Sequence, residues 1–219
     1  MEPRILTHMP SAANEYLAEL RDAGIQQDRA RFRWNLERMG IALGMEISRE
    51  MTYSKQTVQT PLGKAQVDRL ATQPVLATVL RAGIPMHAGM AQVFDRADQA
   101  FVSACRHYET DDHTAFSIRI DAVSSPSLEG RVLIIADPML ATGASLVQVL
   151  QALMKSHGQP AALHIAAVIA SEEGIAHVAE QLPDARIWVG AVDAVLSEKG
   201  YIIPGLGDAG DLAFGPKIN

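Results

Sequence analysis

The amino-acid sequence predicts an α/β fold with a mostly parallel central sheet flanked by helices. Residues 74–80 are almost entirely apolar and residues 132–136 wholly so, which is typical of strands buried on both faces of a sheet. From residue 74 onward, strand-like segments alternate with segments of helical spacing, as in successive βαβ units. With 219 residues, 48% of them hydrophobic, the chain is long enough to bury the core of one such domain.

The N-terminal region predicts two helices. Residues 11–24 have Leu17 and Leu20 on one face and Ser11 as a candidate cap. A second helix is expected over residues 28–47, because its apolar side chains recur at helical spacing: Phe32, Leu36, Met39, Leu43 and Ile47.

A β-hairpin arm is expected next. Residues 51–60 are rich in Thr, Tyr and Val, Pro-Leu-Gly at 61–63 is typical of a turn, and 64–68 is short and polar. The composition of these segments predicts an exposed arm over residues 51–68.

The remaining chain predicts the α/β core and a C-terminal loop. Strands are expected at 74–80, 100–105, 116–120, 132–136, 161–170 and 187–192, and helices at 85–94, 143–157 and 172–182. Residues 200–219 are rich in glycine and are expected to form an ordered loop rather than a helix or strand. We therefore expect a single domain over 1–219, with N-terminal helices (1–50), the arm (51–68), the core (74–199) and the loop (200–219).

Composition excludes several classes of protein. The net charge of −6 argues against broad binding to nucleic acid or to acidic membranes. No apolar run reaches the ~18 residues that a membrane span needs, and the first residues lack a signal-peptide pattern, so we expect a cytoplasmic protein. Cys105 is the one cysteine, and the histidines show no zinc-ligand spacing, so we expect neither an internal disulfide nor a metal site made of protein ligands alone.

A phosphate site is predicted at one end of the sheet. A buried strand delivers Asp137 to the sheet edge, and residues 141–145 follow at the start of a helix. A helix N-terminus offers unpaired N–H groups and partial positive charge, Gly143 lets the backbone approach a ligand, and Thr142 and Ser145 add hydroxyl donors. The pattern describes a site for a ribose 5-phosphate, with an ordinary capped strand–turn–helix as the alternative.

Two further segments follow predicted strands. Arg81 stands directly after a buried strand, and a guanidinium suits phosphate, although a solvated surface arginine is the alternative. Gly205, Gly207 and Gly210 form a G-x-G-x-x-G, but with nine residues after Gly210 neither a helix nor a βαβ unit fits, and a dinucleotide site is rejected. We expect these glycines to expose backbone groups to a flat ligand.

Three runs together resemble the uracil phosphoribosyltransferase family: LRAG at 80–83, DPMLATGAS at 137–145 and GYIIPGLGDAGD at 200–211. The last run is the most discriminating, because other phosphoribosyltransferases share the phosphate loop but not this tail. The resemblance implies a type I phosphoribosyltransferase-like fold. It also implies an enzyme that makes UMP and pyrophosphate from uracil and 5-phosphoribosyl 1-pyrophosphate, with Mg²⁺ bound mainly through the pyrophosphate.

The resemblance also implies residue roles. Arg81 and Arg106 are expected to reach the pyrophosphate, Asp137 to hold the ribose hydroxyls, and Asp208 to lie between base and sugar as the nearest candidate for a general base. The phosphoribosyl contacts are expected to include Pro138, Met139, Leu140, Ala141, Thr142, Gly143, Ala144 and Ser145. The uracil contacts are expected to be Tyr201, Ile202, Gly207, Asp208 and Ala209.

The sequence departs from the family pattern at several places, among them Met45, where a tyrosine is common. Ala144 stands where a second glycine is usual, which matters if that position needs positive φ. The family's mobile flap is associated with proline and tyrosine residues, and residues 111–116 contain neither.

Partners and alternatives follow from the same features. The arm suggests a homodimer or a higher homo-oligomer, and GTP is a candidate effector. One alternative is a nucleotide-sensing regulator of the same fold that binds RNA, which the net charge of −6 disfavours. Another is a phosphoribosyltransferase for a different base, which the tail motif disfavours.

Overall fold

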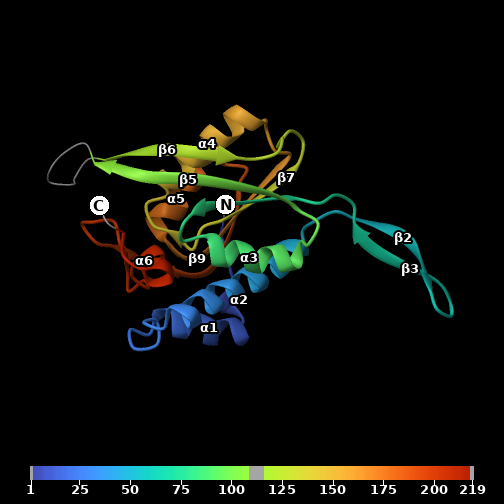
Figure 1. Cartoon of the computed structure of the whole chain (residues 1–219), viewed down its shortest axis with the longest axis horizontal. Coiled ribbons are helices and arrows are strands. Elements are labelled where there is room, and N and C mark those ends of the chain that lie inside the picture. The colour runs from blue at the N-terminus through green and yellow to red at the C-terminus, as the bar shows by residue number, and fades with distance from the viewer. Residues whose placement is uncertain (1, 109–115, 218–219) are drawn as a thin grey trace.

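An eight-stranded sheet forms the centre of the computed structural model, which describes residues 2–108 and 116–217 (Figure 1). Its strands lie in the order β1 (Arg4–Ile5), β10 (Arg186–Asp193), β9 (Ala162–Ser171), β7 (Val132–Ala136), β4 (Val75–Leu80), β5 (Asp98–Tyr108) and β6 (Phe116–Ser124). A short strand, β8 (Met139–Leu140), pairs with β9. Among the described residues of this sheet, β5 and β6 pair antiparallel and the other pairs are parallel, which confirms the predicted fold class.

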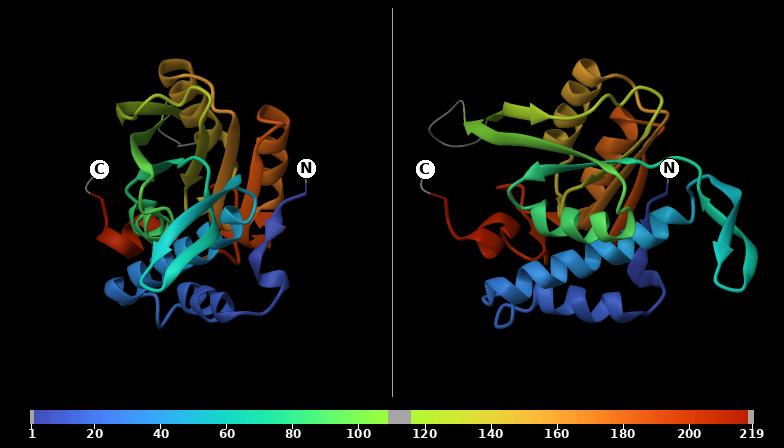
Figure 2. Two further views of the ribbon diagram at one scale, coloured as in Figure 1. Left: turned by 90° about the vertical axis from the view of Figure 1, so that its right-hand side faces the viewer. Right: turned by 45° about the vertical axis from the view of Figure 1, so that its right-hand side comes forward.

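Helices cover both faces of the sheet (Figure 2). On one face lie α1 (Ala12–Arg21), α2 (Arg29–Ser48) and α3 (Ile84–Val93), and on the other lie α4 (Ala144–His157) and α5 (Glu172–Gln181). Strand β7 shows why: Leu133 and Ile135 pack with the α4–α5 side, whereas Ile134 and Ala136 pack with the α1–α3 side. Alternate side chains of a strand point to opposite faces, so an all-apolar strand serves two hydrophobic cores.

Local sequence accounts for the N-terminal helices. The Ser11 hydroxyl accepts a hydrogen bond from the Ala13 N–H, and the Asn14 side chain accepts from the Ser11 N–H. The Asp28 carboxylate caps α2 in the same way by accepting from Ala30 N and Arg31 N. The apolar residues predicted to share one face of the second helix are all buried: Phe32, Leu36, Met39, Leu43 and Ile47.

The hairpin arm is also present. Strands β2 (Tyr53–Thr60) and β3 (Gly63–Leu70) pair antiparallel around a turn at Pro61 and Leu62. The arm projects from the body at the end opposite α6, and the side chain of Leu62 at its tip is fully exposed (Figures 1 and 2). Among the described residues, none of the helices is long and apolar enough to cross a membrane.

The C-terminal region differs from the expectation of an ordered loop without helices or strands. Strands β11 (Val195–Leu196) and β12 (Ile202–Ile203) pair antiparallel, and a short helix, α6 (Ala209–Phe214), follows them. The prediction that no helix fits after the glycines is therefore wrong. The Asp208 carboxylate caps α6 by accepting from the Asp211 N–H at 3.0 Å, and the buried Ala209 and Ala213 anchor the helix in the core.

Candidate functional site

A cleft of about 520 Å³ lies at the carboxyl ends of β4 and β7. Arg81 lines it from the loop after β4, Asp137 and Ser145 from the segment after β7, and Tyr201 and Asp208 from the C-terminal tail. Loops at the carboxyl ends of parallel strands converge at one edge of a sheet, which is where ligands bind in open α/β folds. The structure thus brings together the three segments that the sequence singled out.

The N-terminus of α4 is arranged to accept an anion. Gly143 precedes the helix with φ of +76° and has no side chain with which to cap it, and the Thr142 hydroxyl makes one long bond, at 3.4 Å, to the Ala144 N–H. The Ser145 hydroxyl is buried at the cleft and has no hydrogen-bond partner among the described residues. Unpaired N–H groups and an unpartnered hydroxyl at the positive end of a helix suit a phosphate group.

The structure answers the question raised by Ala144. This residue is the first of α4, and the left-handed backbone conformation belongs to Gly143 instead. A Cβ atom at Gly143 would lie 2.9 Å from the Gly174 carbonyl oxygen, so both conformation and space require glycine there. The methyl group of Ala144 is compatible with the helical start of the loop.

Two residues that sequence reasoning missed, at the junction of β9 and α5, support this loop. The Ser171 hydroxyl donates to the Ala141 carbonyl oxygen at 2.6 Å and accepts from the Gly174 N–H at 2.8 Å. A Cβ atom at Gly174 would lie 2.0 Å from the Ala141 carbonyl oxygen. Ser171 immediately precedes the helix predicted at 172–182, and the preference of serine for helix N-caps could have revealed part of its role.

Asp137 lies where β7 ends, as the sequence predicted. Its Oδ1 atom accepts a hydrogen bond from the Met139 N–H at 3.3 Å, and its side chain lines the cleft. Just before it, the Ala136 carbonyl oxygen accepts from the buried Thr78 hydroxyl at 2.8 Å. A Cβ atom at Gly83 would lie 2.0 Å from that same hydroxyl oxygen. The loops after β4 and β7 are therefore packed tightly against each other.

Arg81 contacts the tail rather than solvent alone. Its Nη2 atom donates to Asp211 Oδ1 and to the Gly215 carbonyl oxygen, both at 3.1 Å. Its Nε atom is buried without a hydrogen-bond partner among the described residues. The peptide bond between Leu80 and Arg81 is cis. Sequence reasoning missed Asp211 and Lys217, which also line the cleft, although the second aspartate of the tail motif was a visible signal.

The structure places some of the expected uracil contacts at the cleft and others away from it. Tyr201, Asp208 and Ala209 line the cleft. The side chain of Ile202 is buried in the core beside α2, and Gly207 borders a separate cavity of about 310 Å³ near Gln26. The side chain of Ile202 therefore packs inward, its backbone pairs with Leu196 between β11 and β12, and Ile202 is not among the residues that line the cleft.

The remaining predicted residues have varied positions. The backbone of Arg106 pairs with Ile118 between β5 and β6, and its side chain lies outside the described part of the structure. The flap residues 111–116 likewise fall outside it, except for the backbone of Phe116 in β6. Met139 and Ala141 line the cleft, Leu140 is buried in the core, and the Pro138 carbonyl oxygen accepts from Val168 N and Ile169 N. The Thr142 hydroxyl accepts from Ala144 N at 3.4 Å.

The described residues form no ready-made cluster of metal ligands. Within residues 2–108 and 116–217, no three His, Cys, Asp or Glu side chains are grouped as metal ligands. The cleft itself is lined by the carboxylates of Asp137, Asp208 and Asp211 together with the cations Arg81 and Lys217.

A mostly parallel sheet that carries a carboxylate, a glycine-containing loop and a helix N-terminus at one edge is the arrangement of the type I phosphoribosyltransferases. An orotate phosphoribosyltransferase from Mycobacterium tuberculosis, solved with 5-phospho-alpha-D-ribosyl 1-diphosphate, shares this fold. It has a TM-score of 0.53 at 13% identity, and the match covers 91% of this chain and 99% of that one.

Sequence comparison places the chain more narrowly. The family model for uracil phosphoribosyltransferase matches residues 8–216, and the chain belongs to this family. Uracil phosphoribosyltransferase of Porphyromonas gingivalis is 46% identical over 209 residues, which are 95% of each chain. The protein of that name from Thermococcus gammatolerans is 41% identical, over 93% of this chain and 89% of its own. The AQ2163 protein from Aquifex aeolicus matches over 100% of both chains with a TM-score of 0.86 and 29% identity.

Proposed function

We propose that this enzyme transfers the 5-phosphoribosyl group of 5-phosphoribosyl 1-pyrophosphate to uracil, forming UMP and pyrophosphate. The observation that carries the proposal is the N-terminus of α4, where the buried Ser145 hydroxyl has no partner among the described residues and borders the same cleft as Asp137. A phosphate dianion satisfies the hydroxyl and the N–H groups together. Asp137, at the end of the adjacent strand, is then placed to accept hydrogen bonds from the ribose hydroxyls.

The pyrophosphate is the leaving group, and negative charge grows on it during the reaction. Arg81 offers a buried Nε–H without a partner among the described residues, in addition to its bonds to the tail. A guanidinium held in place stabilises developing charge without reorganising at the moment of reaction. Arg106 is proposed for the same role from β5.

Magnesium is proposed to bind with the substrate. Mg²⁺ prefers oxygen ligands and is commonly held by one or two carboxylates together with substrate phosphates. The donor set of the cleft fits this habit, because Asp137, Asp208 and Asp211 all line it. When bound, the ion neutralises charge on the pyrophosphate.

The tail is proposed to hold the base. Tyr201 and Ala209 line the cleft beside Asp208, whose Oδ1 atom accepts from the Asp211 N–H at 3.0 Å. Uracil offers a carbonyl acceptor and an N–H donor at one edge, and backbone groups of the tail can match both. Positioning uracil in line with the anomeric carbon supplies much of the rate enhancement, and Asp208 is the candidate to accept the proton of the attacking nitrogen.

A base panel tests this proposal. The enzyme is mixed with 5-phosphoribosyl 1-pyrophosphate, Mg²⁺ and one of uracil, cytosine, orotate or hypoxanthine, and pyrophosphate release is followed. We expect release with uracil and rejection of cytosine by ~10⁴-fold, because a hydrogen-bonding site rejects a mismatched edge strongly. Ser145→Ala is expected to raise the KM for 5-phosphoribosyl 1-pyrophosphate. Comparable turnover of another base would overturn the assignment of substrate.

The arm is proposed to mediate a homodimer. Its two strands have mostly exposed side chains and project away from the body, with the fully exposed Leu62 at the tip. The arm is a separate two-stranded sheet, which is marginally stable by itself in water, so packing against a second copy of the chain would stabilise it. Sedimentation of the parent protein is expected to show a dimer or a higher oligomer that Leu62→Asp weakens, and a monomeric parent would contradict the proposal.

A cytoplasmic location and regulation by GTP complete the proposal. The location is expected from the composition of the sequence, and the effector from the family resemblance. The regulatory part is tested by following UMP formation at subsaturating substrate with and without GTP, with ATP as the matched control. A rate that responds equally to both nucleotides, or to neither, rules out a specific effector role.

A further inference from the structure

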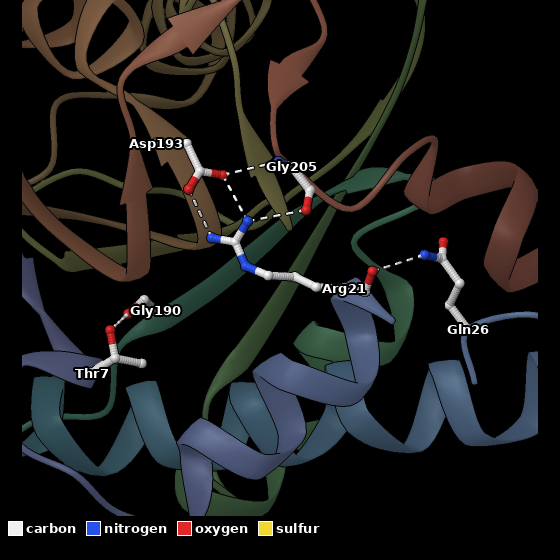
Figure 3. Close-up of polar contacts among 6 residues, drawn as sticks. All are labelled: Thr7, Arg21, Gln26, Gly190, Asp193 and Gly205. Carbon is white, nitrogen blue, oxygen red and sulfur yellow. Dashed lines mark hydrogen bonds and ion pairs between the residues drawn. The ribbon is translucent and has the colours of Figure 1, made fainter. Parts of the chain in front are cut away.

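An ion pair outside the cleft holds the backbone of the tail (Figure 3). Arg21, the last residue of α1, donates from Nη1 to Asp193 Oδ2 at 2.8 Å and from Nη2 to Asp193 Oδ1 at 2.9 Å. Nη1 also donates to the Gly205 carbonyl oxygen at 3.0 Å, and Asp193 Oδ2 accepts from the Gly205 N–H at 3.1 Å. Both polar groups of one tail residue are therefore bonded to the same ion pair.

The pair is well shielded from water. The side chain of Asp193, at the end of β10, is 8% exposed and that of Arg21 is 23% exposed. Its two-point geometry is that of a fork-to-carboxylate pair, which fixes orientation as well as distance. Removal of either partner leaves the other charge buried and uncompensated.

Gly205 is a sensitive point in the tail. Its φ is +62°, and a Cβ atom there would lie 2.1 Å from the Ile202 carbonyl oxygen, so the chain turns sharply at this residue. Bonds to its N–H and its carbonyl oxygen restrain the peptide planes on both sides of it. Tyr201 precedes this point and Asp208 and Ala209 follow it, and all three line the cleft.

The helix that supplies Arg21 is itself held firmly. Glu19 of α1 accepts from Arg31 Nε at 2.8 Å and from Asn35 Nδ2 at 2.6 Å, and both donors belong to α2. Leu17 and Leu20 of α1 are buried in the core beneath the sheet. Arg21 thus extends from a fixed support to the tail, across 184 residues of sequence to Gly205.

We propose that Arg21 and Asp193 are positioning residues that hold the tail in the conformation that binds the base. This inference rests on the proposed function, because it assigns the tail to the base. Neither residue borders the cleft, so each acts through Gly205. The phosphate loop at α4 is held by other side-chain contacts, those of Ser171 and Gly174, although Ser171 is the backbone neighbour of Asp193 across β9 and β10.

The kinetic test compares Arg21→Gln, Arg21→Lys and Asp193→Asn with the parent enzyme. Loss of the charged hydrogen bonds is expected to raise the KM for uracil by roughly ten- to a hundredfold. The Kd for 5-phosphoribosyl 1-pyrophosphate, measured without uracil by calorimetry, is expected to stay near the parent value. Arg21→Lys keeps the charge but loses the fork, so it is expected to give a smaller rise.

Arg131→Gln is the matched control. Arg131 also pairs with an aspartate, Asp98, and donates to the backbone at Gln73, but it lies at the opposite ends of the strands from the cleft. We expect Arg131→Gln to lower the thermal midpoint without changing the KM for uracil relative to the Kd for 5-phosphoribosyl 1-pyrophosphate. If the Arg21 and Asp193 variants weaken binding of both substrates in parallel, the pair stabilises the fold only and the proposal is wrong.

Hydrogen–deuterium exchange provides a second measurement that needs no activity. Faster exchange in residues 202–210 of the variants, with the start of α4 unchanged, supports the proposal. Equal exchange in parent and variants refutes it. If the parent releases no pyrophosphate with uracil, the proposed function fails while the exchange result still decides whether the pair holds the tail.

Discussion

Arg81 Nη2 lies 3.1 Å from Asp211 Oδ1, so an ion pair joins the loop after β4 to helix α6 of the tail. The two side chains are 35% and 40% exposed, and a pair this solvated contributes at most about 1 kcal/mol of stability. Its larger consequence is geometric. The pair orients the guanidinium along one wall of the cleft, with the buried Nε–H left for a ligand.

Arg81→Lys is expected to impair the enzyme while it keeps the fold. Lysine retains the positive charge and can still reach Asp211, but it lacks the planar fork and the Nε–H donor. We expect kcat/KM for 5-phosphoribosyl 1-pyrophosphate to fall by roughly tenfold or more, as the loss of one charged hydrogen bond predicts. Steady-state kinetics measure this, with the exposed Arg96→Lys as control. Parent-like kinetics in Arg81→Lys would remove Arg81 from the pyrophosphate site.

Asp137→Asn is expected to remove the carboxylate charge while the local structure is kept. The amide oxygen can still accept from the Met139 N–H, so the turn after β7 is expected to persist. The charged hydrogen bonds to ribose hydroxyls, each worth roughly 1.5–3 kcal/mol, are lost. Pyrophosphate release is expected to fall steeply, while the thermal midpoint stays near that of the parent. Asp184→Asn, an exposed site between α5 and β10, is the control that should change neither quantity.

Gly143→Ala is expected to damage the phosphate loop, and Gly130→Ala is its matched control. Both glycines have positive φ, +76° and +69°, so both substitutions strain the backbone. A Cβ atom at Gly143 would also lie 2.9 Å from the Gly174 carbonyl oxygen, whereas one at Gly130 meets nothing within 4 Å. Both variants are expected to lose some stability, and Gly143→Ala alone is expected to lose affinity for 5-phosphoribosyl 1-pyrophosphate. Equal affinities in calorimetry would contradict the role of the loop.

His164 is expected to make stability depend on pH. Its Nδ1 atom accepts from Trp188 Nε1 at 3.1 Å, and burial, with Arg186 nearby, lowers the pKa of His164 from 6.5 to about 4. Between these values the unfolded chain binds more protons than the folded one. The stabilising contribution is therefore complete above pH 6.5 and is lost as the pH falls towards 4. Its full size is on the order of 3 kcal/mol.

Urea unfolding at a series of pH values tests this expectation. His164→Gln keeps an acceptor for the Trp188 N–H but removes the titrating ring. The free energy of unfolding of the parent should fall more steeply between pH 6.5 and 4 than that of the variant. Identical slopes would show that other groups set the pH dependence.

Much of the fold was predictable because its determinants are local. The apolar runs of β4 and β7, the caps at Ser11 and Asp28, and the turn of the arm are each encoded within a few consecutive residues. Asp137 and residues 141–145 were predictable for the same reason, since strand, carboxylate and loop follow one another directly along the chain.

Helix α6 was missed because local sequence does not stabilise it. A six-residue helix is far below the length at which an isolated helix is stable, and it contains Gly210. The burial of Ala209 and Ala213 and the cap at Asp208 hold it in place. These are contacts with distant parts of the chain, apart from the cap, and periodicity cannot reveal them.

By itself, the sequence determined the α/β class, the order of the main helices and strands from α1 to β10, and the loop that begins α4. Only the tertiary structure decided that Arg81 meets Asp211 and that Arg21 and Asp193, 172 residues apart, hold Gly205 between them. The physical reason is that backbone periodicity and capping act over a few residues, whereas an ion pair forms where packed elements bring two side chains together. The shape of the tail, and with it the cleft, therefore depends on how α1, β10 and α6 pack around the sheet.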